Sequence, residues 1–418
     1  MADADSEDVY RPTAHTSHRI RTGLERARED ARAFEDDPAR ALAGARTRAA
    51  ASARGPASLA VAMGDPQAPL ARVLEVLDRH DLLSDDGAVH GDAALVSMGD
   101  HFDWGAPEQR PFAAESGYAL LAWLAAQPED RVTILVGNHD LARVGELAPF
   151  DDATFAAARD EARALRGIRI GTPGRAERRQ AFLARYPSLP SVGVAVRDLS
   201  TFEARQRDLV RALLEGGRMR AAKAAAPDLL LIHAAITPDD LDSIGFPEGA
   251  ARADAFALER AIGERFERAI EGWDGASSLA IAPLYLPGDA RHGESRGVFV
   301  QRPADPAVGE LPLFEGPPRR RFDPRMLTPG LSQVTGHIRD QKCRDLMPVW
   351  SDDEPARDGP LRHLWTDGRR VRYRSGLPAG DEAGALLLFA DGGMNHAAPA
   401  DYELLDLRTR RALPRAGA

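Results

Sequence analysis

Short apolar runs alternate with longer amphipathic segments over the first third of the chain. Each run is rich in Ala, Val, Leu or Ile, which is typical of a buried strand in a parallel sheet. The segments between the runs repeat their apolar positions with helical spacing, so the pattern predicts βαβ units. The predicted strands cover residues 58–63, 94–98 and 132–136, and the predicted helices cover residues 70–80, 112–127 and 141–147.

This rhythm stops in a charged stretch rich in Ala and Arg, residues 151–226, which we interpret as an inserted helical cap. A strand at 229–232 and an amphipathic helix at 251–271 then restore the core pattern. The C-terminal part predicts a further strand at 331–335, followed by an antiparallel β finish. The predicted helices of the cap cover 152–166, 176–185 and 201–225, and the runs of the β finish cover 361–366, 369–374, 384–390 and 402–407.

Residues 1–55 are charged and carry little aliphatic mass. They predict an N-terminal extension that either packs as a peripheral helix or stays mobile. The remaining residues, 56–418, are interpreted as one domain that contains the 151–226 insertion.

Composition narrows the class of protein. Of the 418 residues, 44% are hydrophobic, but no apolar run approaches the roughly 20 residues of a membrane helix, so a soluble protein without a membrane partner is expected. The acidic start lacks the order of a secretory signal, and Cys343 has no second cysteine to pair with, so a cytoplasmic location is expected. The net charge of -10 disfavours broad non-specific binding to nucleic acid. The oligomeric state is left open.

Polar motifs follow the predicted strands. Gly-Asp-His-Phe-Asp-Trp-Gly stands at 99–105 and Gly-Asn-His-Asp at 137–140, each directly after an apolar run. The carboxyl ends of parallel strands are where α/β folds place active sites, and carboxylate, amide and imidazole groups are metal ligands and proton donors. The polar residues that follow strands are, in order, Asp65, Gln67, Asp100, Asp103, Asn138, His139, His233 and His337.

This ordered set resembles the calcineurin-like metallophosphoesterase superfamily. Its pattern is Asp-x-His, Gly-Asp-x-x-Asp-x-Gly, Gly-Asn-His-Asp/Glu, a strand-end His and a Gly-His, and the resemblance covers roughly residues 58–407 without the insertion. The resemblance implies an α/β fold, a four-layer αββα sandwich of two mixed β-sheets flanked by helices. It also implies metal-dependent hydrolysis of a phosphomonoester by hydroxide generated at a dinuclear site.

The resemblance also assigns roles to residues. Asp100 corresponds to the ligand that bridges two divalent ions, expected to be Mn²⁺ first, then Fe or Zn²⁺. His139 corresponds to a general acid that protonates the leaving group, oriented by Asp103. The implied ligands are Asp65 and Gln67 for the first metal and Asn138, His233 and His337 for the second.

Within the superfamily, the chain is most similar to the phosphoprotein phosphatase, Shewanella-like and diadenosine tetraphosphatase branch. The segment Glu294-Ser-Arg-Gly-Val-Phe299 resembles the one that supplies a phosphate-binding arginine there, which makes Arg296 the implied clamp on the substrate. Gln67 replaces the usual histidine, and Trp104 replaces an arginine that anchors phosphate. Arg143 and Arg339 are candidate substitutes for that anchor.

Two other functions remain open on the sequence alone. One is cleavage of phosphodiester or pyrophosphate bonds in a nucleotide, as in diadenosine tetraphosphatases. The other is a catalytically weak metal-binding scaffold, which the changes at Gln67 and Trp104 would suit. For either catalytic function, the expected partner is a phosphorylated substrate: a small molecule, a nucleotide or a phosphoprotein.

Overall fold

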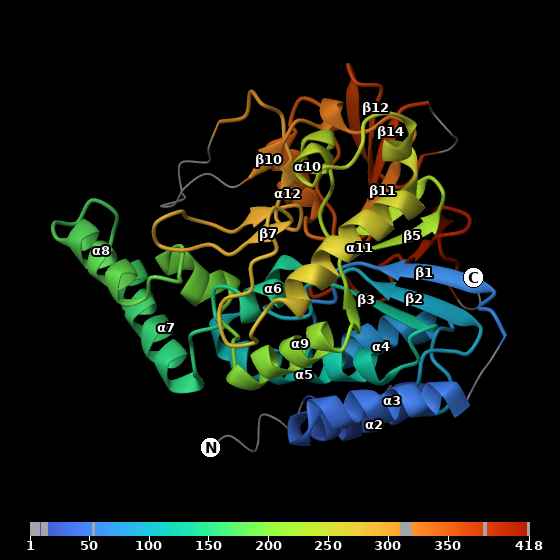
Figure 1. Ribbon diagram of the computed structural model, residues 1–418, viewed down its shortest axis with the longest axis horizontal. Helices are drawn as coiled ribbons and strands as arrows, with labels where there is room; N and C mark the ends of the chain where they lie inside the picture. The colour runs from blue at the N-terminus through green and yellow to red at the C-terminus, as the bar shows by residue number, and fades with distance from the viewer. Residues whose placement is uncertain (1–8, 10–15, 52–54, 310–319, 379–382, 416–418) are drawn as a thin grey trace.

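Two mixed β-sheets flanked by helices form the centre of the protein, as the predicted βαβ pattern implies (Figure 1). The structure is a computed structural model and describes residues 9, 16–51, 55–309, 320–378 and 383–415. Its two large sheets have six strands each among these residues. This arrangement confirms the expected α/β class with two mixed sheets.

The first sheet contains the early predicted strands in parallel order. Val61 pairs with Leu95, and Leu95 pairs with Val132 on the next strand, so the three strands end at the same edge. Two C-terminal strands extend this sheet: the first pairs antiparallel with the strand at 59–63, and the second pairs antiparallel with the first. Its order is β16 (Arg411–Ala412), β15 (Leu405–Asp406), β1 (Leu59–Met63), β2 (Ala93–Ser97), β3 (Val132–Leu135) and β4 (Met219–Arg220).

The second sheet has a parallel centre and antiparallel edges. The expected antiparallel pairing holds between the C-terminal runs 361–366, 369–374 and 384–390. The last of these runs also pairs in parallel with the predicted strand at 331–335, where Ser332 lies opposite Leu386. Residues 385–389 are buried except at Leu386, which is partly exposed, and continuous apolar runs suit a parallel sheet centre. The order is β13 (Val371–Ser375), β12 (Arg362–Thr366), β14 (Ala385–Phe389), β11 (Ser332–Thr335), β6 (Leu229–Ile232) and β5 (Ala222–Ala226).

Apolar side chains from both sheets form a shared layer between them, including Val96, Leu135, Leu231, Val334 and Leu388. Helices cover the outer faces, and no described helix combines the length and apolarity that crossing a membrane requires. The helices of the core are α4 (Leu70–Arg79), α5 (Arg110–Ala126), α6 (Asn138–Val144), α10 (Pro238–Ser243), α11 (Ala255–Glu271) and α12 (Asp340–Leu346).

The insertion is helical only in part. Helices α7 (Asp152–Gly167) and α8 (Arg175–Arg185) project from the body (Figure 1) and share a small aromatic core, in which Phe155 contacts both Phe150 and Phe202. A π-helical turn at Val194–Asp198 and helix α9 (Ala204–Glu215) follow. Residues 186–203, which include this turn, bring the chain from the insertion back toward the sheets.

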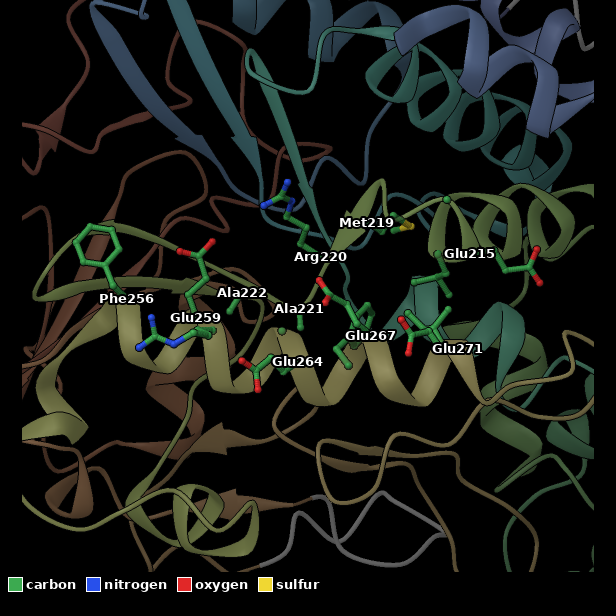
Figure 2. Close-up of a pocket in the computed structure, with 17 residues that line it drawn as sticks. Glu215, Met219, Arg220, Ala221, Ala222, Phe256, Glu259, Glu264, Glu267 and Glu271 are labelled. Carbon is green, nitrogen blue, oxygen red and sulfur yellow. The ribbon is translucent and has the colours of Figure 1, made fainter.

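The predicted helix over 201–225 is wrong beyond Glu215. Gly216 and Gly217 end α9, and the Ala-rich residues after them form β4 and β5, which join the edges of the two sheets. Alanine favours helix in isolation, but pairing with Leu230 and Ile232 overrides that preference here. Both strands and α11 line a groove of about 570 Å³ whose rim carries several glutamates (Figure 2).

The N-terminal segment contains two helices, α2 (His18–Asp36) and α3 (Pro38–Ala51), which form an outer layer beside α5 (Figure 1). Leu24, Ala27 and Phe34 are buried on one side of α2. Ser17 caps this helix and also donates a hydrogen bond of 2.8 Å to Asp78 on α4. The few apolar residues of this charged segment thus share one helical face.

The burial of Asp30 on α2 predicts that replacing its carboxyl group stabilises the protein in a pH-dependent way. Its side chain is 14% exposed, and burial raises the pKa of the carboxyl from 3.8 to about 6. The folded state therefore carries the cost of an ionised buried carboxylate above pH 6, at most roughly 3 kcal/mol. Asp30→Asn is expected to raise the melting temperature at pH 7.5 and to leave it nearly unchanged near pH 3, where the carboxyl is largely protonated in both states.

The matched control for this prediction is Asp36→Asn at the exposed end of the same helix. It removes one negative charge without removing a buried one, so its melting temperature is expected to stay near that of the wild type at both pH values. Equal shifts in the two variants would contradict the burial argument.

Candidate metal centre and proton-donor pair

The loop after β2 and the start of α6 are held together by Asp140. Its buried carboxylate accepts hydrogen bonds from the backbone N–H groups of Gly137, Asp100 and His101 at 2.9 to 3.1 Å. Gly137 has to be glycine, because a Cβ there would overlap the Asp100 carboxylate. The two motifs that the sequence analysis singled out therefore touch through their backbones, and Asp100 lies beside Asn138 and His139.

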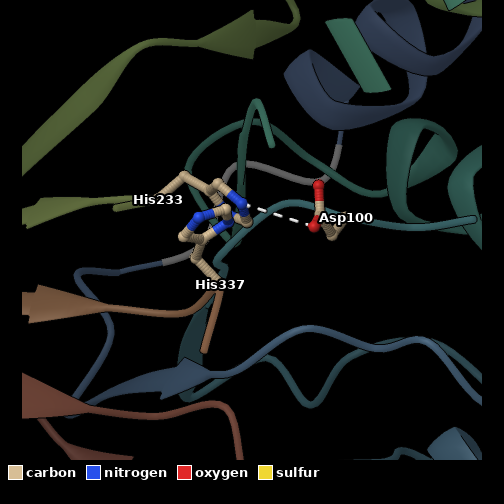
Figure 3. Close-up of side chains that lie close together, drawn as sticks. All are labelled: Asp100, His233 and His337. Atoms are coloured by element: carbon tan, nitrogen blue, oxygen red, sulfur yellow. Dashed lines mark ion pairs between the residues drawn. The ribbon is translucent and has the colours of Figure 1, made fainter. Parts of the chain in front are cut away.

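Asp100, His233 and His337 form a group that can hold a metal ion, and we call these three residues the metal-type group (Figure 3). One ligand atom of each lies within 4.8 Å of the others, and His233 Nε2 is 3.4 Å from Asp100 Oδ2. His233 Nδ1 lies 2.8 Å from the Met98 carbonyl oxygen, which leaves Nε2 as the nitrogen facing Asp100. Such a hydrogen bond on the far nitrogen is how proteins fix a metal-binding imidazole.

The protonation states within this group differ. Burial opposes protonation of His233, but the Asp100 carboxylate outweighs it and raises the pKa of that imidazole, so a cation bound there would take the place of its proton. Burial and the nearby Arg302 guanidinium hold the pKa of His337 well below its usual range, so its lone pair is free. Burial opposes ionisation of Asp100, but the imidazoles of His233 and His139 outweigh it and lower the pKa of that carboxyl. The group therefore offers a carboxylate together with a neutral imidazole.

Asp65 supplies an independent test of whether the residues fit a metal. Its buried Oδ1 has no hydrogen-bond partner, whereas Oδ2 accepts from the His337 backbone N–H at 2.8 Å. Burial and the carboxylates of Asp391 and Asp100 raise the pKa of Asp65 well above its ordinary value. A cation would satisfy this orphaned oxygen and offset the clustered negative charge. Gly336 keeps the space open, since a Cβ there would overlap Oδ1.

Two other predicted ligands lie nearby: Asn138 beside the metal-type group, and Gln67 beside the loop after β2. Asn138 Oδ1 is 3.2 Å from His233 Nε2, so its amide oxygen faces the metal-type group. Gln67 donates its amide N–H to the Phe102 carbonyl at 2.7 Å, which ties the loop after β1 to the loop after β2. That hydrogen bond uses the amide nitrogen and leaves the oxygen as the possible ligand atom.

Backbone strain concentrates at the same place. Asp100, Asp103 and His337 have φ values of 57°, 66° and 67°, and they are three of the five described non-glycine residues with positive φ. Residues other than glycine adopt this region at a cost, and such outliers cluster at functional sites. The strain turns these side chains toward the edge where the strands of both sheets end.

His139 and Asp103 form the predicted pair. His139 Nδ1 lies 2.9 Å from Asp103 Oδ2, and Nε2 lies 3.9 Å from Asp100 Oδ2. Burial opposes protonation of His139, but the two carboxylates raise its pKa to about 9, so the imidazole carries a proton at neutral pH. Burial also opposes ionisation of Asp103, but the Arg143 guanidinium, 2.6 Å away, and His139 bring the pKa of Asp103 to about 2.

The candidate arginines are in different environments. Arg296 on β8 (Arg296–Gly297) is exposed and does not line the cavity beside His139. Arg143 is fully buried and engaged with Asp103, and Arg339 is half exposed at 3.9 Å from Asp358. Trp104 is 7% exposed and packs edge-to-face on Phe112, which fits the rim of the site.

The cavity beside Asn138 and His139 has a volume of about 170 Å³. Its walls come from the insertion, from the loop around residue 295, and from two arginines that the sequence analysis did not select. The lining includes Pro190, Val194, Asp198, Leu199, Ser295, Val300, Arg302 and Arg320. Arg302 stands on β9 (Arg302–Pro303), and its Nη1 donates to the Val300 carbonyl at 3.1 Å.

Sequence reasoning also missed the structural importance of Asp140 and Asp391. Asp140 was visible as the last residue of Gly-Asn-His-Asp, and a carboxylate at the third residue of a helix is a known capping-box position. It also lies 3.1 Å from His101 Nδ1, so His101 is a buried residue of the loop rather than a surface histidine. Asp391 was visible in Phe389-Ala-Asp-Gly-Gly-Met394, but nothing in that segment indicated its closeness to Asp65.

Comparison with known proteins adds no family to this description. No family model matches the chain, and no curated protein sequence matches it. The functional assignment therefore depends on the residues and geometry of the site.

Proposed function

We propose that this protein is a metal-dependent phosphoric monoester hydrolase with the metallophosphoesterase sandwich fold. One observation carries the proposal: a single oxygen, Asp100 Oδ2, lies 3.4 Å from the metal-type imidazole of His233 and 3.9 Å from the proton-bearing imidazole of His139. A cation site and a general acid thus share one carboxylate. Hydrolysis of a phosphoric ester needs both, one to neutralise the phosphoryl oxygens and one to protonate the leaving group.

The proposed ligand set is the one implied by the resemblance, with Asp65, Gln67, Asp100, Asn138, His233 and His337 holding two divalent ions. It mixes carboxylate, amide and imidazole donors, which suits Mn²⁺, Fe or Zn²⁺ better than Ca²⁺. Ions bound there would supply the nucleophile by lowering the pKa of water and would polarise the phosphoryl oxygens. The unpartnered Asp65 Oδ1 and the clustered carboxylates support this assignment.

The chain's own residues supply the rest of the chemistry. His139, charged at neutral pH, holds its mobile proton on Nε2, because Nδ1 is occupied by Asp103. His139 lines the cavity, so this proton can pass to the oxygen of the departing alcohol. A cavity of about 170 Å³ suits a compact ester group better than a whole dinucleoside polyphosphate.

Three substrates assayed with the metal-loaded protein test the proposal. With Mn²⁺, the protein is expected to hydrolyse p-nitrophenyl phosphate. Turnover of bis-p-nitrophenyl phosphate and diadenosine tetraphosphate alone would assign the nucleotide phosphodiesterase or pyrophosphatase function instead. No hydrolysis of any of the three with Mn²⁺, Fe²⁺ or Zn²⁺ would reject the enzyme and favour the metal-binding scaffold.

Arg302 is expected to bind the phosphoryl group, because it lines the cavity beside His139 and lies close enough to His337 to lower its pKa. A hydrogen bond to a charged group contributes about 1.5–3 kcal/mol, so Arg302→Ala is expected to reduce kcat/KM for p-nitrophenyl phosphate about ten- to hundredfold. Steady-state kinetics check this value. Arg296→Ala is the comparison, and a larger loss there would return the anchor to the residue implied by the family resemblance.

A further inference from the structure

The carboxylate of Asp103 is held on both of its oxygens. Oδ2 accepts from His139 and Arg143, whereas Oδ1 accepts from Thr201 twice, from the backbone N–H at 3.1 Å and from the hydroxyl at 2.7 Å. Asp103 and Thr201 are 98 positions apart, and Thr201 lies in the turn between the π-helical segment and α9. The insertion therefore reaches the centre of the site through one residue.

Thr201 is part of a buried polar network rather than an isolated contact. Its hydroxyl oxygen accepts from Arg143 Nη2 at 3.3 Å, and Arg143 Nε donates to Gln206 on α9 at 3.2 Å. Gln206 in turn donates to the backbone carbonyls of Thr201 and of Ala114 on α5, at 3.1 and 3.2 Å. Arg143, Gln206 and Thr201 are each at most 2% exposed. A fully satisfied buried network of this kind specifies one arrangement.

The two oxygens of Asp103 have different tasks. His139 and Arg143 meet the same oxygen, Oδ2, and neither contacts Oδ1 among the described contacts. Thr201 holds Oδ1, so both oxygens of the carboxylate are fixed. Asp103 also has a φ of 66°, a conformation that persists only where surrounding contacts impose it. The direction of the His139 ring therefore depends on a contact supplied by the insertion.

We propose that Thr201 is a positioning residue, through which the 151–226 insertion holds Asp103 and aims His139 at the leaving group. The inference rests on the proposed phosphoric ester hydrolysis and adds a role for the insertion beyond that of lining the cavity. Thr201 touches neither the metal-type group nor the cavity among the described contacts, so it acts through Asp103 and through Arg143, which binds the same carboxylate.

The test replaces the hydroxyl by a methyl group in Thr201→Val and compares two esters. p-Nitrophenolate departs readily without protonation, whereas phenolate depends on the general acid, so misalignment of His139 affects phenyl phosphate more. We expect kcat for phenyl phosphate to fall about ten- to hundredfold, the range for a lost outer partner of a site residue, with a clearly smaller loss for p-nitrophenyl phosphate. The Mn²⁺ content and KM are expected to stay at wild-type values.

Two variants separate positioning from folding. Thr201→Ser keeps the hydroxyl and is expected to restore the ratio of the two kcat values. Ser200→Ala removes the neighbouring hydroxyl, which donates only to the Arg197 carbonyl at 3.3 Å among the described contacts, and is expected to leave the ratio and both rates unchanged. Melting curves of all variants identify any that unfold, and if Thr201→Val is one of them, Thr201→Ala takes its place in the comparison.

The outcomes distinguish the positioning role of Thr201 from the proposed function on which it rests. Wild-type protein that hydrolyses neither ester with Mn²⁺ overturns the proposed function and the role of Thr201 with it. Active wild-type protein with an equal loss on both esters in Thr201→Val overturns only the positioning role. A loss of bound Mn²⁺ in Thr201→Val has the same consequence, because the residue would then act on the metal site.

Discussion

Asp100→Asn is expected to abolish both metal binding and hydrolysis. The substitution keeps the size of the side chain, and an amide oxygen can still accept the 2.8 Å hydrogen bond that the His139 backbone N–H donates to Oδ1. It removes the negative charge next to His233 and His337, with which Asp100 forms the metal-type group. Loss of an outer-shell partner alone costs metal sites about ten- to hundredfold in affinity, and loss of a central ligand is expected to exceed that.

Isothermal titration with Mn²⁺ and the melting temperature with and without Mn²⁺ measure this effect. A ligand that binds only the folded state raises the melting temperature, so the wild type is expected to shift and Asp100→Asn is not. Asp406→Asn is the matched control, because its buried carboxylate accepts only backbone N–H groups of the turn after β15 among the described contacts. Wild-type Mn²⁺ affinity in Asp100→Asn would contradict the assignment of the metal centre.

His139→Asn is expected to separate catalysis from metal binding. The imidazole is hydrogen-bonded to Asp103 at 2.9 Å and carries a proton at neutral pH, since the neighbouring carboxylates raise its pKa to about 9 against the effect of burial. General acid catalysis contributes about 10²- to 10⁴-fold, so kcat is expected to fall by that factor for phenyl phosphate. Mn²⁺ affinity is expected to remain near the wild-type value, because the proposed role of His139 is that of a proton donor and not of a ligand.

Kinetics and Mn²⁺ titration of the same protein sample check both parts of this prediction. His396→Asn is the control, since His396 is exposed in a loop and touches neither Asp100 nor Asp103 among the described contacts. A marked loss of Mn²⁺ affinity in His139→Asn would identify His139 as a metal ligand. Unchanged turnover of phenyl phosphate would remove it from the reaction.

Local patterns were sufficient to predict most elements of the core. The apolar runs at 58–63, 132–136 and 229–232 became strands within one residue of the expected bounds, because a short run of branched and aliphatic residues between polar loops has few other places in a fold. The pattern failed at 219–226. There the alanines of 222–226 favour a helix on their own, and only antiparallel pairing with the neighbouring β6 makes them a strand.

The candidate site shows the same division. Asp100, Asn138, His139, His233 and His337 were selected because each follows a strand in a recognisable motif, and motif chemistry is local. Arg302 and Thr201 have no such signal. Arg302 is an ordinary arginine on the two-residue strand β9, and Thr201 is a threonine in a charged insertion, so their closeness to the site depends on contacts between segments far apart in the chain.

The sequence by itself determined which polar residues follow the ends of the strands and in what order, because strand periodicity and turn chemistry are set by neighbouring residues. Only the tertiary structure decided which of them meet. Two sheets had to pack through a common apolar layer before Asp65, Asp100, His233 and His337 could share one edge. The insertion had to fold back before Thr201 could reach Asp103, since long-range contacts depend on packing that no local pattern encodes.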